Sequence, residues 1–357
     1  MTNRIRLLQK SYDKSKIDGY LISDETSILY FTGFLGAHRL LVPDEGDGVL
    51  YVYGTNYEAA KKMARNCTVE LLQRGEDVDK RLATKARKLK LRNIGFNSLE
   101  VSAHNKLKKA LAGMKLTSAS QLVWDLRKVK DAFEIACIRK AAELTDVAAK
   151  KAAEVLKPGI REYEVAAEAE YAMRKLGSEG PPPTFDTIVA SGSRSAFPHG
   201  GCTSKRVRKG ELIQFDIGAR CHGYAADLTR TFLIGKPTPK QKKIYEIVKE
   251  AQEKAFQTIR HGVKAQQVDA AARTLIKKRG FGENFPHGLG HGVGLEVHES
   301  PTLNTVSKDV LKAGNVVTDE PGIYILGYGG VRIEDTVLVR KDGAERLTRA
   351  PYPMTVD

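Results

Sequence analysis

The stretch that decides the fold is residues 211–231, which reads ELIQFDIGARCHGYAADLTRT. Two runs rich in strand-forming residues flank His222-Gly223, a dipeptide typical of a two-residue hairpin turn. With a turn of that length, Asp216 faces Thr229, and Asp227 is the diagonal neighbour of Asp216 on the same face. Converging carboxylates on a half-buried sheet repel each other and lose solvation unless a cation lies between them. The stretch therefore predicts a hairpin that carries a cation site.

Two further acidic segments follow, each in a β-prone run beside glycine-rich turns. They are TDEPGIY (residues 318–324), which contains Glu320, and GVRIEDTVLV (residues 330–339), which contains Glu334. Before them lies PHGLGHGVGLEVHESP (residues 286–301), where His291 has glycine on both sides, as suits a ligand on a tightly bent backbone. Four carboxylates and one imidazole suit Mn, Co, Fe or Zn, and can hold two ions about 3.5–4 Å apart.

Each of these segments, taken alone, has an ordinary structural explanation. A pair of Asp residues on a hairpin commonly marks a turn or a salt bridge, and Glu-Pro-Gly commonly marks a turn. A glycine-flanked histidine is commonly a packing residue. Their joint occurrence in this order favours a metal site over scaffold.

The chain is predicted to contain two domains, residues 1–125 and 126–357. In the first, short strands alternate with charged helices, which predicts an α/β layer domain whose sheet is parallel at least in part. The strands are expected at residues 20–22, 48–53 and 93–96, and the helices at 57–64, 78–89 and 103–112. In the second, apolar periodicity predicts helices over 132–155, 162–176, 239–262 and 267–279, with Thr238 as N-cap of the third.

Composition narrows the classes of partner. The 357 residues carry 58 Lys and Arg against 43 Asp and Glu, a formal charge of +15 that at first suggests an anionic partner. Much of that charge falls on predicted solvated helix faces, and no nucleic-acid motif with interleaved aromatic residues occurs. No apolar run approaches the ~18 residues of a membrane span, and the four cysteines lack CxxC spacing. We expect a cytoplasmic protein that binds neither nucleic acid nor membrane.

The order Asp216, Asp227, His291, Glu320, Glu334 resembles the five-ligand signature of the pita-bread metallopeptidases, which include methionine aminopeptidase, aminopeptidase P and prolidase. The resemblance runs from about residue 126 to 339. The N-terminal third resembles the creatinase/prolidase N-domain in GYLISD (19–24) and ILYFTGF (28–34). The resemblance implies an α+β pita-bread catalytic domain preceded by a smaller α/β domain.

The resemblance also implies roles for individual residues. Asp216 is expected to bind one divalent ion, and His291 and Glu320 are expected to bind the other. Asp227 and Glu334 are expected to bind both ions. Mn, Co and Zn are the candidate ions. Glu320 would shuttle a proton, His298 would hydrogen-bond the scissile carbonyl, and His199 would contact substrate. Thr229 and Arg332 would orient the carboxylates. His222 and His287 match no such role and are interpreted as turn and packing residues.

The implied function is hydrolysis of the imide bond in Xaa-Pro dipeptides, with an Xaa-Pro aminopeptidase on longer peptides as the alternative. Two departures from the family pattern bear on this choice and on the site. Asp319 stands where an apolar residue is usual, and it is expected to point away from the metals and to pair with a basic residue, or else to weaken the site. Thr302 stands where many prolidases carry an arginine for the dipeptide carboxylate. A remote alternative is an inactive pita-bread module that binds through its basic surface.

A homodimer is implied as well, because prolidase-like members are commonly dimers. In that assembly, the loop that contains His38 could reach the active site of a partner subunit.

Overall fold

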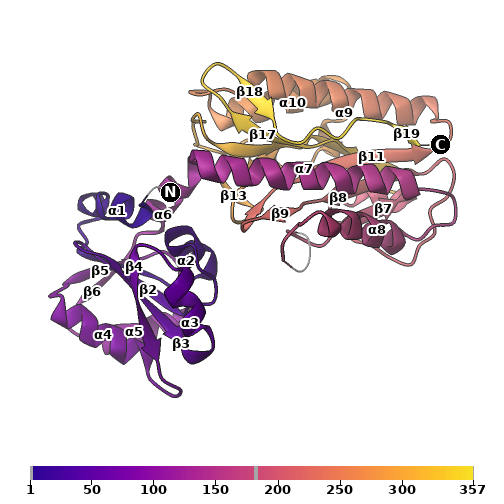
Figure 1. The fold of residues 1–357 in the computed structure, drawn as a ribbon. Helices are drawn as coiled ribbons and strands as arrows, with labels where there is room; N and C mark the ends of the chain where they lie inside the picture. The colour runs from indigo at the N-terminus through magenta and orange to yellow at the C-terminus, as the bar shows by residue number, and fades with distance from the viewer. Residues whose placement is uncertain (1–2, 181–183, 357) are drawn as a thin grey trace. The chain divides into compact units, whose positions relative to one another are not determined.

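The computed structural model describes residues 3–180 and 184–356. They form two compact units, residues 1–127 and 128–357 (Figure 1). Within the described residues, no helix combines the length and the apolar composition that crossing a membrane requires.

The first unit is built on a mixed six-stranded sheet with the order β4-β3-β2-β1-β5-β6. Strand β2 runs antiparallel to both neighbours, and the other pairs are parallel, so the predicted partly parallel sheet is confirmed. The predicted strands correspond to β1, β3 and β5, whereas the edge strands β4 and β6 and the buried β2 were not predicted. The strands are β1 Gly19–Ile22, β2 Arg39–Pro43, β3 Gly48–Tyr53, β4 Cys67–Leu72, β5 Asn93–Phe96 and β6 Lys115–Ser118.

Short helices surround this sheet. The three predicted helices are present as α3, α4 and α5, and α4 and α5 pack on an apolar cluster that includes Leu21, Leu82, Ile94 and Leu107. The helices are α1 Arg4–Gln9, α2 Glu25–Thr32, α3 Gly54–Met63, α4 Val78–Lys88, α5 Val101–Ala110 and α6 Ser120–Lys128, with a 3₁₀ turn at Tyr12–Ser15.

The second unit contains the four helices that the periodicity predicts. They are α7 Ala132–Val155, α8 Glu162–Lys175, α9 Pro239–Thr258 and α10 Ala265–Lys278. Thr238 caps α9 through its hydroxyl, with Pro239 at the first position, as predicted. Helix α9 ends four residues before Gly262, because Ile259 adopts an extended backbone with ψ of 115°.

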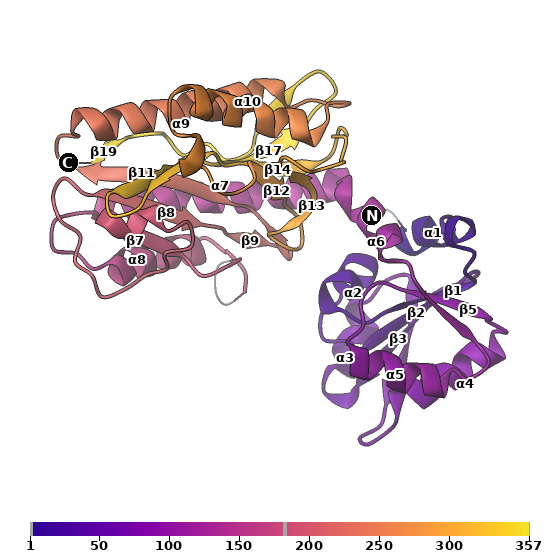
Figure 2. The same cartoon turned by 180° about the vertical axis from the view of Figure 1, so that it is seen from behind.

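Two sheets form the middle of the second unit (Figure 2). One has the order β19-β11-β8-β7 and the other the order β13-β12-β14-β17-β18. Helices α7 and α8 pack on the first sheet, and α9 and α10 pack mainly on the second, each pair over its own apolar cluster. The strands are β7 Ile188–Ser191, β8 Leu212–Ile217, β11 Leu228–Ile234, β12 Gly290–Gly292, β13 Glu299–Leu303, β14 Val316–Asp319, β17 Asp335–Val339, β18 Ala344–Arg346 and β19 Thr355–Val356.

Two small hairpins complete this unit. They are β9 Arg220–Cys221 with β10 Tyr224–Ala225, and β15 Gly322–Ile325 with β16 Gly329–Arg332; 3₁₀ turns lie at Gly192–Ala196 and Gly282–Asn284.

The hairpin predicted from residues 211–231 is confirmed. Asp216 pairs with Thr229 in the β8–β11 ladder, and Cys221 pairs with Tyr224 across the turn. Both turn residues have positive φ, 49° at His222 and 80° at Gly223, as a type I′ turn requires.

The prediction that Glu320 and Glu334 lie inside strands is wrong. Strand β14 ends at Asp319 and β15 begins at Gly322, so Glu320 lies in the gap between them. Glu334 lies in the gap between β16 and β17. Pro321 has no N–H to continue a ladder, and the N–H of Glu334 donates to the Thr229 carbonyl of β11 at 3.1 Å instead of to its own hairpin.

Candidate metal centre

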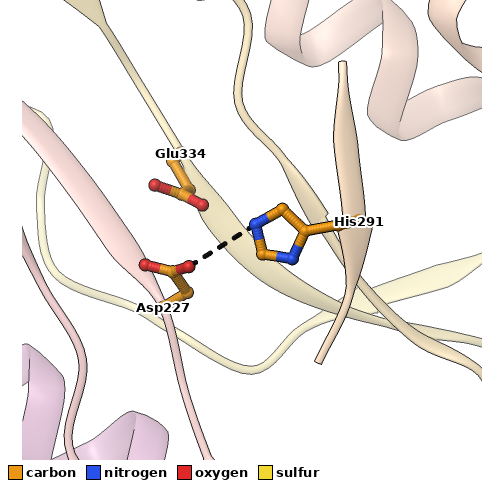
Figure 3. Close-up of side chains that lie close together, drawn as sticks. All are labelled: Asp227, His291 and Glu334. Carbon is orange, nitrogen blue, oxygen red and sulfur yellow. Dashed lines mark ion pairs between the residues drawn. The ribbon is translucent and has the colours of Figure 1, made fainter. Parts of the chain in front are cut away.

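Asp227, His291 and Glu334 form a cluster in which one ligand atom of each lies within 4.8 Å of the others. Asp227 directly precedes β11, His291 is the middle residue of β12, and Glu334 precedes β17. Figure 3 shows both carboxylates turned toward the imidazole, with the His291 Nε2 atom 3.7 Å from Asp227 Oδ2. Three segments that are distant in sequence therefore present ligand-type atoms to one point.

The imidazole of His291 has a defined orientation. Its Nδ1 atom lies 3.1 Å from the Gly292 carbonyl, which can only accept, so Nδ1 carries a proton and Nε2 faces the cluster. Nε2 lies 3.3 Å from Glu320 Oε1. Burial lowers the pKa of His291, but the bond and charge of Glu320 outweigh it and the pKa is raised. Burial raises the pKa of Glu320, but the hydrogen bond and charge of His291 outweigh burial and lower this pKa to about 2.

The other carboxylates are buried without full hydrogen bonding. Burial raises the pKa of Asp216 against the opposing charge of Arg332. Burial, followed by the charges of neighbouring carboxylates, raises the pKa values of Asp227 and Glu334 well above their usual range. Among the described residues, Asp216 Oδ1 and Asp227 Oδ1 are buried with no hydrogen-bond partner. Unpartnered carboxylate oxygens beside an imidazole nitrogen form the donor set that divalent Mn, Co or Zn accepts. The residues present therefore fit divalent cations.

Thr229 and Arg332 hold two of these carboxylates. The Thr229 hydroxyl donates to Glu334 Oε2 at 2.6 Å and accepts from Arg332 Nε at 2.9 Å. Arg332 Nη2 donates to Asp216 Oδ2 at 2.5 Å. Because metal-ligating carboxylates need a fixed orientation, these contacts place Thr229 and Arg332 where they can supply it.

The same network extends to Tyr324 and His287, whose participation the sequence did not reveal. Arg332 Nη1 donates to the Tyr324 hydroxyl at 3.1 Å. The His287 Nδ1–H group donates to the Gly288 carbonyl at 2.8 Å, so its Nε2 atom accepts from the Tyr324 hydroxyl at 3.0 Å. His287 packs against Tyr324, but it also ends a hydrogen-bonded chain that begins at Asp216. Its position four residues before His291, beside glycine, is the signal that could have indicated this.

His298 and His199 lie beside the cluster. Both side chains belong to exposed residues. The His298 ring lies 4.3 Å from that of His291, centroid to centroid. Burial and then the charge of His291 lower the pKa of His298, and His199 is close enough to contribute in the same direction. The backbone beside His199 is fixed, because the Pro198 carbonyl accepts from Arg332 Nη1 and from Gln214 Nε2, each at 3.1 Å.

The two departures from the family pattern have different surroundings. Asp319 is fully buried opposite Asp335 of β17, and neither of its carboxylate oxygens has a hydrogen-bond partner among the described residues. The expected pairing with a basic residue is therefore not formed, since the Arg346 guanidinium donates to Gln252 and Glu253 instead. Thr302 is exposed on β13, opposite His291 in register.

Comparisons with known proteins place the sequence and the fold. Residues 136–341 match the model of metallopeptidase family M24, and residues 4–129 match the creatinase/prolidase N-terminal domain. An Xaa-Pro dipeptidase from Pyrococcus horikoshii is 41% identical over 98% of this chain and 97% of its own length. A solved Xaa-Pro dipeptidase from Bacillus anthracis superposes with a TM-score of 0.94 at 36% identity, with 99% of each chain covered.

A solved X-Pro aminopeptidase from Thermotoga maritima superposes with a TM-score of 0.89 at 36% identity, covering 97% of this chain and 100% of its own. The fold expected from the sequence, a pita-bread catalytic domain after a smaller α/β domain, is confirmed by these neighbours. The chain belongs to metallopeptidase family M24 and carries that family's creatinase/prolidase N-terminal domain.

Proposed function

We propose that this protein is an Xaa-Pro dipeptidase that hydrolyses the imide bond of small proline-containing peptides with two divalent metal ions. The observation that carries the proposal is the convergence of Asp227, His291 and Glu334 within 4.8 Å. Glu320 contacts His291 of that cluster, and Asp216 is linked to Glu334 through Arg332 and Thr229. The similarity to Xaa-Pro dipeptidases over nearly the full chain supports the substrate class.

Asp216, Asp227, His291, Glu320 and Glu334 would hold the ions. Divalent ions supply Lewis acidity toward the scissile carbonyl and lower the pKa of bound water toward ~7. Glu320 is the group that would carry a proton toward the leaving imide nitrogen, since its low pKa leaves it ionised and able to accept one. Arg332 and Thr229 would keep the carboxylates of Asp216 and Glu334 oriented during turnover.

His298 and His199 would act on the substrate. The lowered pKa of His298 keeps it neutral near pH 7, and a neutral imidazole can donate one N–H to the scissile carbonyl oxygen. His199 follows a backbone fixed by Arg332, which suits a side chain that positions the peptide.

A second candidate function is favoured by Thr302. A threonine cannot make the bidentate ion pair by which arginine binds a terminal carboxylate. A site without that pair accepts Xaa-Pro-Yaa peptides as readily as dipeptides, which is the behaviour of an Xaa-Pro aminopeptidase. The remote alternative of an inactive binding module is disfavoured, because each of the five predicted ligand positions carries a ligand-type side chain.

The metal requirement is tested by chelation followed by add-back. We expect the chelated protein to lose hydrolysis of an Xaa-Pro dipeptide, and Mn²⁺, Co²⁺ or Zn²⁺ to restore it. Failure of every ion to restore hydrolysis of any Xaa-Pro peptide would show that the proposed function is wrong.

The substrate length is tested by comparing kcat/KM for an Xaa-Pro dipeptide and the matching Xaa-Pro-Yaa tripeptide. A clear preference for the dipeptide supports the dipeptidase, and a kcat/KM for the tripeptide that equals or exceeds that for the dipeptide supports the aminopeptidase. The cytoplasmic location and the homodimer stay predictions, and size-exclusion chromatography with light scattering measures the second.

A further inference from the structure

The proposed ligands come from two sheets, which meet along a seam between β11 and residues 331–336. A backbone hydrogen bond of 3.1 Å crosses the seam from Glu334 to Thr229. Threonine hydroxyls supply further links. Thr231 Oγ1 accepts from the Arg332 N–H at 3.1 Å and donates to the Arg332 carbonyl at 2.9 Å. Thr336 Oγ1 likewise accepts from the Asp227 N–H at 2.9 Å and donates to the Asp227 carbonyl at 2.8 Å.

Arg230 spans this seam from the face opposite the cluster. Its side chain is 1% exposed. Its Nη1 atom donates to the carbonyls of Thr229 at 3.0 Å and of Glu334 at 2.6 Å, one on each side of the seam. Its Nη2 atom donates to the Ala350 carbonyl at 2.6 Å, and its Nε atom donates to the Pro351 carbonyl at 3.1 Å. We call Asp216 and Asp227 one half-site, and His291, Glu320 and Glu334 the other. One guanidinium therefore connects both half-sites and the C-terminal segment.

Asp335 anchors Arg230. The Asp335 carboxylate is fully buried, and its Oδ1 atom accepts from Arg230 Nη2 at 2.9 Å and from the Thr348 hydroxyl at 2.8 Å. Its Oδ2 atom accepts from Gln252 of α9 at 2.8 Å and from the Tyr352 hydroxyl. Neighbouring residues on extended backbone point to opposite faces. Arg230 and Asp335 thus lie behind Thr229 and Glu334, the two residues that meet at the cluster.

We propose that Arg230, anchored by Asp335, is a positioning residue that sets the separation of the two half-sites, so that Asp227 and Glu334 can share metal ions. This inference rests on the proposed function. The planar guanidinium reaches two carbonyls and a carboxylate at once, whereas a lysine ammonium is a point charge on a flexible stem and cannot hold all of them in one geometry. Widening the seam weakens metal binding, because ligands from both sheets must reach the same ions.

The test is calorimetric titration of chelator-treated Arg230→Lys with Mn²⁺, together with thermal unfolding of the metal-free protein. We expect the affinity of at least one Mn²⁺ site to fall about 10–100-fold, as when groups behind metal ligands are changed. Excess Mn²⁺ should restore kcat with KM unchanged, because substrate contacts are untouched.

Arg139→Lys is the matched control. Arg139 makes a bidentate pair with Glu345, at 2.5 and 2.8 Å, between α7 and β18 and away from the seam. We expect this control to lower the thermal transition while leaving Mn²⁺ affinity unchanged. If Arg230→Lys behaves as the control does, Arg230 has a structural role alone and the inference is overturned.

Asp335→Asn keeps the inference testable if Arg230→Lys does not fold, because it preserves the shape of the side chain and an oxygen for Arg230. We expect weaker Mn²⁺ binding in this variant also, and unchanged binding would overturn the inference. Wild-type protein that binds none of Mn²⁺, Co²⁺ and Zn²⁺ would overturn the proposed function and the inference with it. Wild-type binding that neither variant alters would overturn the inference alone.

Discussion

Asp227 is buried, and one of its carboxylate oxygens lacks a hydrogen-bond partner among the described residues. Asp319 is also buried and unpartnered, but Asp227 differs because its Oδ2 atom lies 3.7 Å from His291 Nε2, where a bound metal ion would satisfy the free oxygen. We predict that Asp227→Asn lowers kcat by at least about 100-fold, because the proposed metal site would lose one of its ligands. Without metal, its thermal transition should be unchanged or higher, since an amide is cheaper to bury than a carboxylate. Differential scanning calorimetry and a peptidase assay measure both quantities.

Asp269→Asn is the matched control for that prediction. Asp269 is equally buried but paired, since Arg273 Nε donates to its Oδ2 atom at 2.8 Å. Its replacement should lower the thermal transition of the metal-free protein. Unfolding of Asp227→Asn under the same conditions would mean that Asp227 is scaffold and not ligand.

Asp319 is a second buried carboxylate, but it faces away from the cluster toward Asp335. Burial and then the charge of Asp335 raise its pKa well above the usual range. A raised folded-state pKa means that the group's contribution to stability is present below the unfolded pKa of ~3.9 and is lost as the pH rises. We predict that Asp319→Val stabilises the metal-free protein by about 1–3 kcal/mol, with a larger gain near pH 8 than near pH 5.

Urea unfolding at the two pH values measures this gain. Asp319→Asn is the control, because it removes the charge but keeps an unpartnered polar group, so its gain should be smaller. A valine variant that is less stable than wild type near pH 8 would contradict the prediction.

At the scale of elements, the turn between β9 and β10 sets the register that brings Asp216 and Asp227 together. His222 has φ of 49° and Gly223 has φ of 80°. A β-branched residue is strained at positive φ, so Gly223→Val should destabilise the protein by about 1–2 kcal/mol. His222→Asn should be neutral or stabilising, because asparagine tolerates this conformation better than most residues.

Chemical denaturation of both variants tests this prediction. Both sites lie in an exposed turn away from the cluster, so metal-saturated kcat should stay at the wild-type value for His222→Asn. Equal effects of the two substitutions on the unfolding midpoint would show that the backbone conformation of the turn is not what matters.

At the scale of the whole molecule, metal binding and stability are linked through the cluster. Because the pKa values of Asp216, Asp227 and Glu334 are raised, the stability that these groups contribute to the metal-free protein is lost as the pH rises from ~4. The raised pKa of His291 acts in the same direction, whereas Glu320, with a pKa of about 2, contributes above ~4.3. Deprotonation therefore destabilises the metal-free protein overall.

Cations that replace these protons should stabilise the second unit more at high pH than at low pH. We predict that a fixed Mn²⁺ concentration, about 100 times the Kd measured near pH 8, adds about 2.7 kcal/mol to the free energy of unfolding at that pH. The same concentration should add less near pH 5, because protons compete for the ligands and raise the Kd. Thermal unfolding with and without Mn²⁺ at each pH measures this. Equal increments at both pH values would contradict the linkage.

Local patterns in the sequence predicted many of the helices and strands. The four helices of the second unit follow from apolar residues every three or four positions, and the β8–β11 hairpin follows from its turn dipeptide. Strand β6 (KLTS) was not predicted because it is short and contains a single apolar residue, whereas β4 (CTVELL) keeps an apolar and polar alternation that could have indicated it. Glu320 and Glu334 were wrongly placed inside strands. Each lies in a two-residue gap between strands, and such a gap depends on which distant backbone group accepts the hydrogen bond.

The sequence by itself determined the residue types and the order of the proposed ligands, because the motifs that resemble the family signature can be read without knowing the structure. It also determined the register that sets Asp216 opposite Thr229, since a two-residue turn leaves a single register. Only the tertiary structure decided that Asp319 has no hydrogen-bond partner in the described part of the chain, that His287 ends a hydrogen-bonded chain from Asp216 and that Arg230 spans the seam. These facts depend on contacts between residues up to 121 positions apart, and hydrogen bonds across such separations leave no periodic trace in the chain.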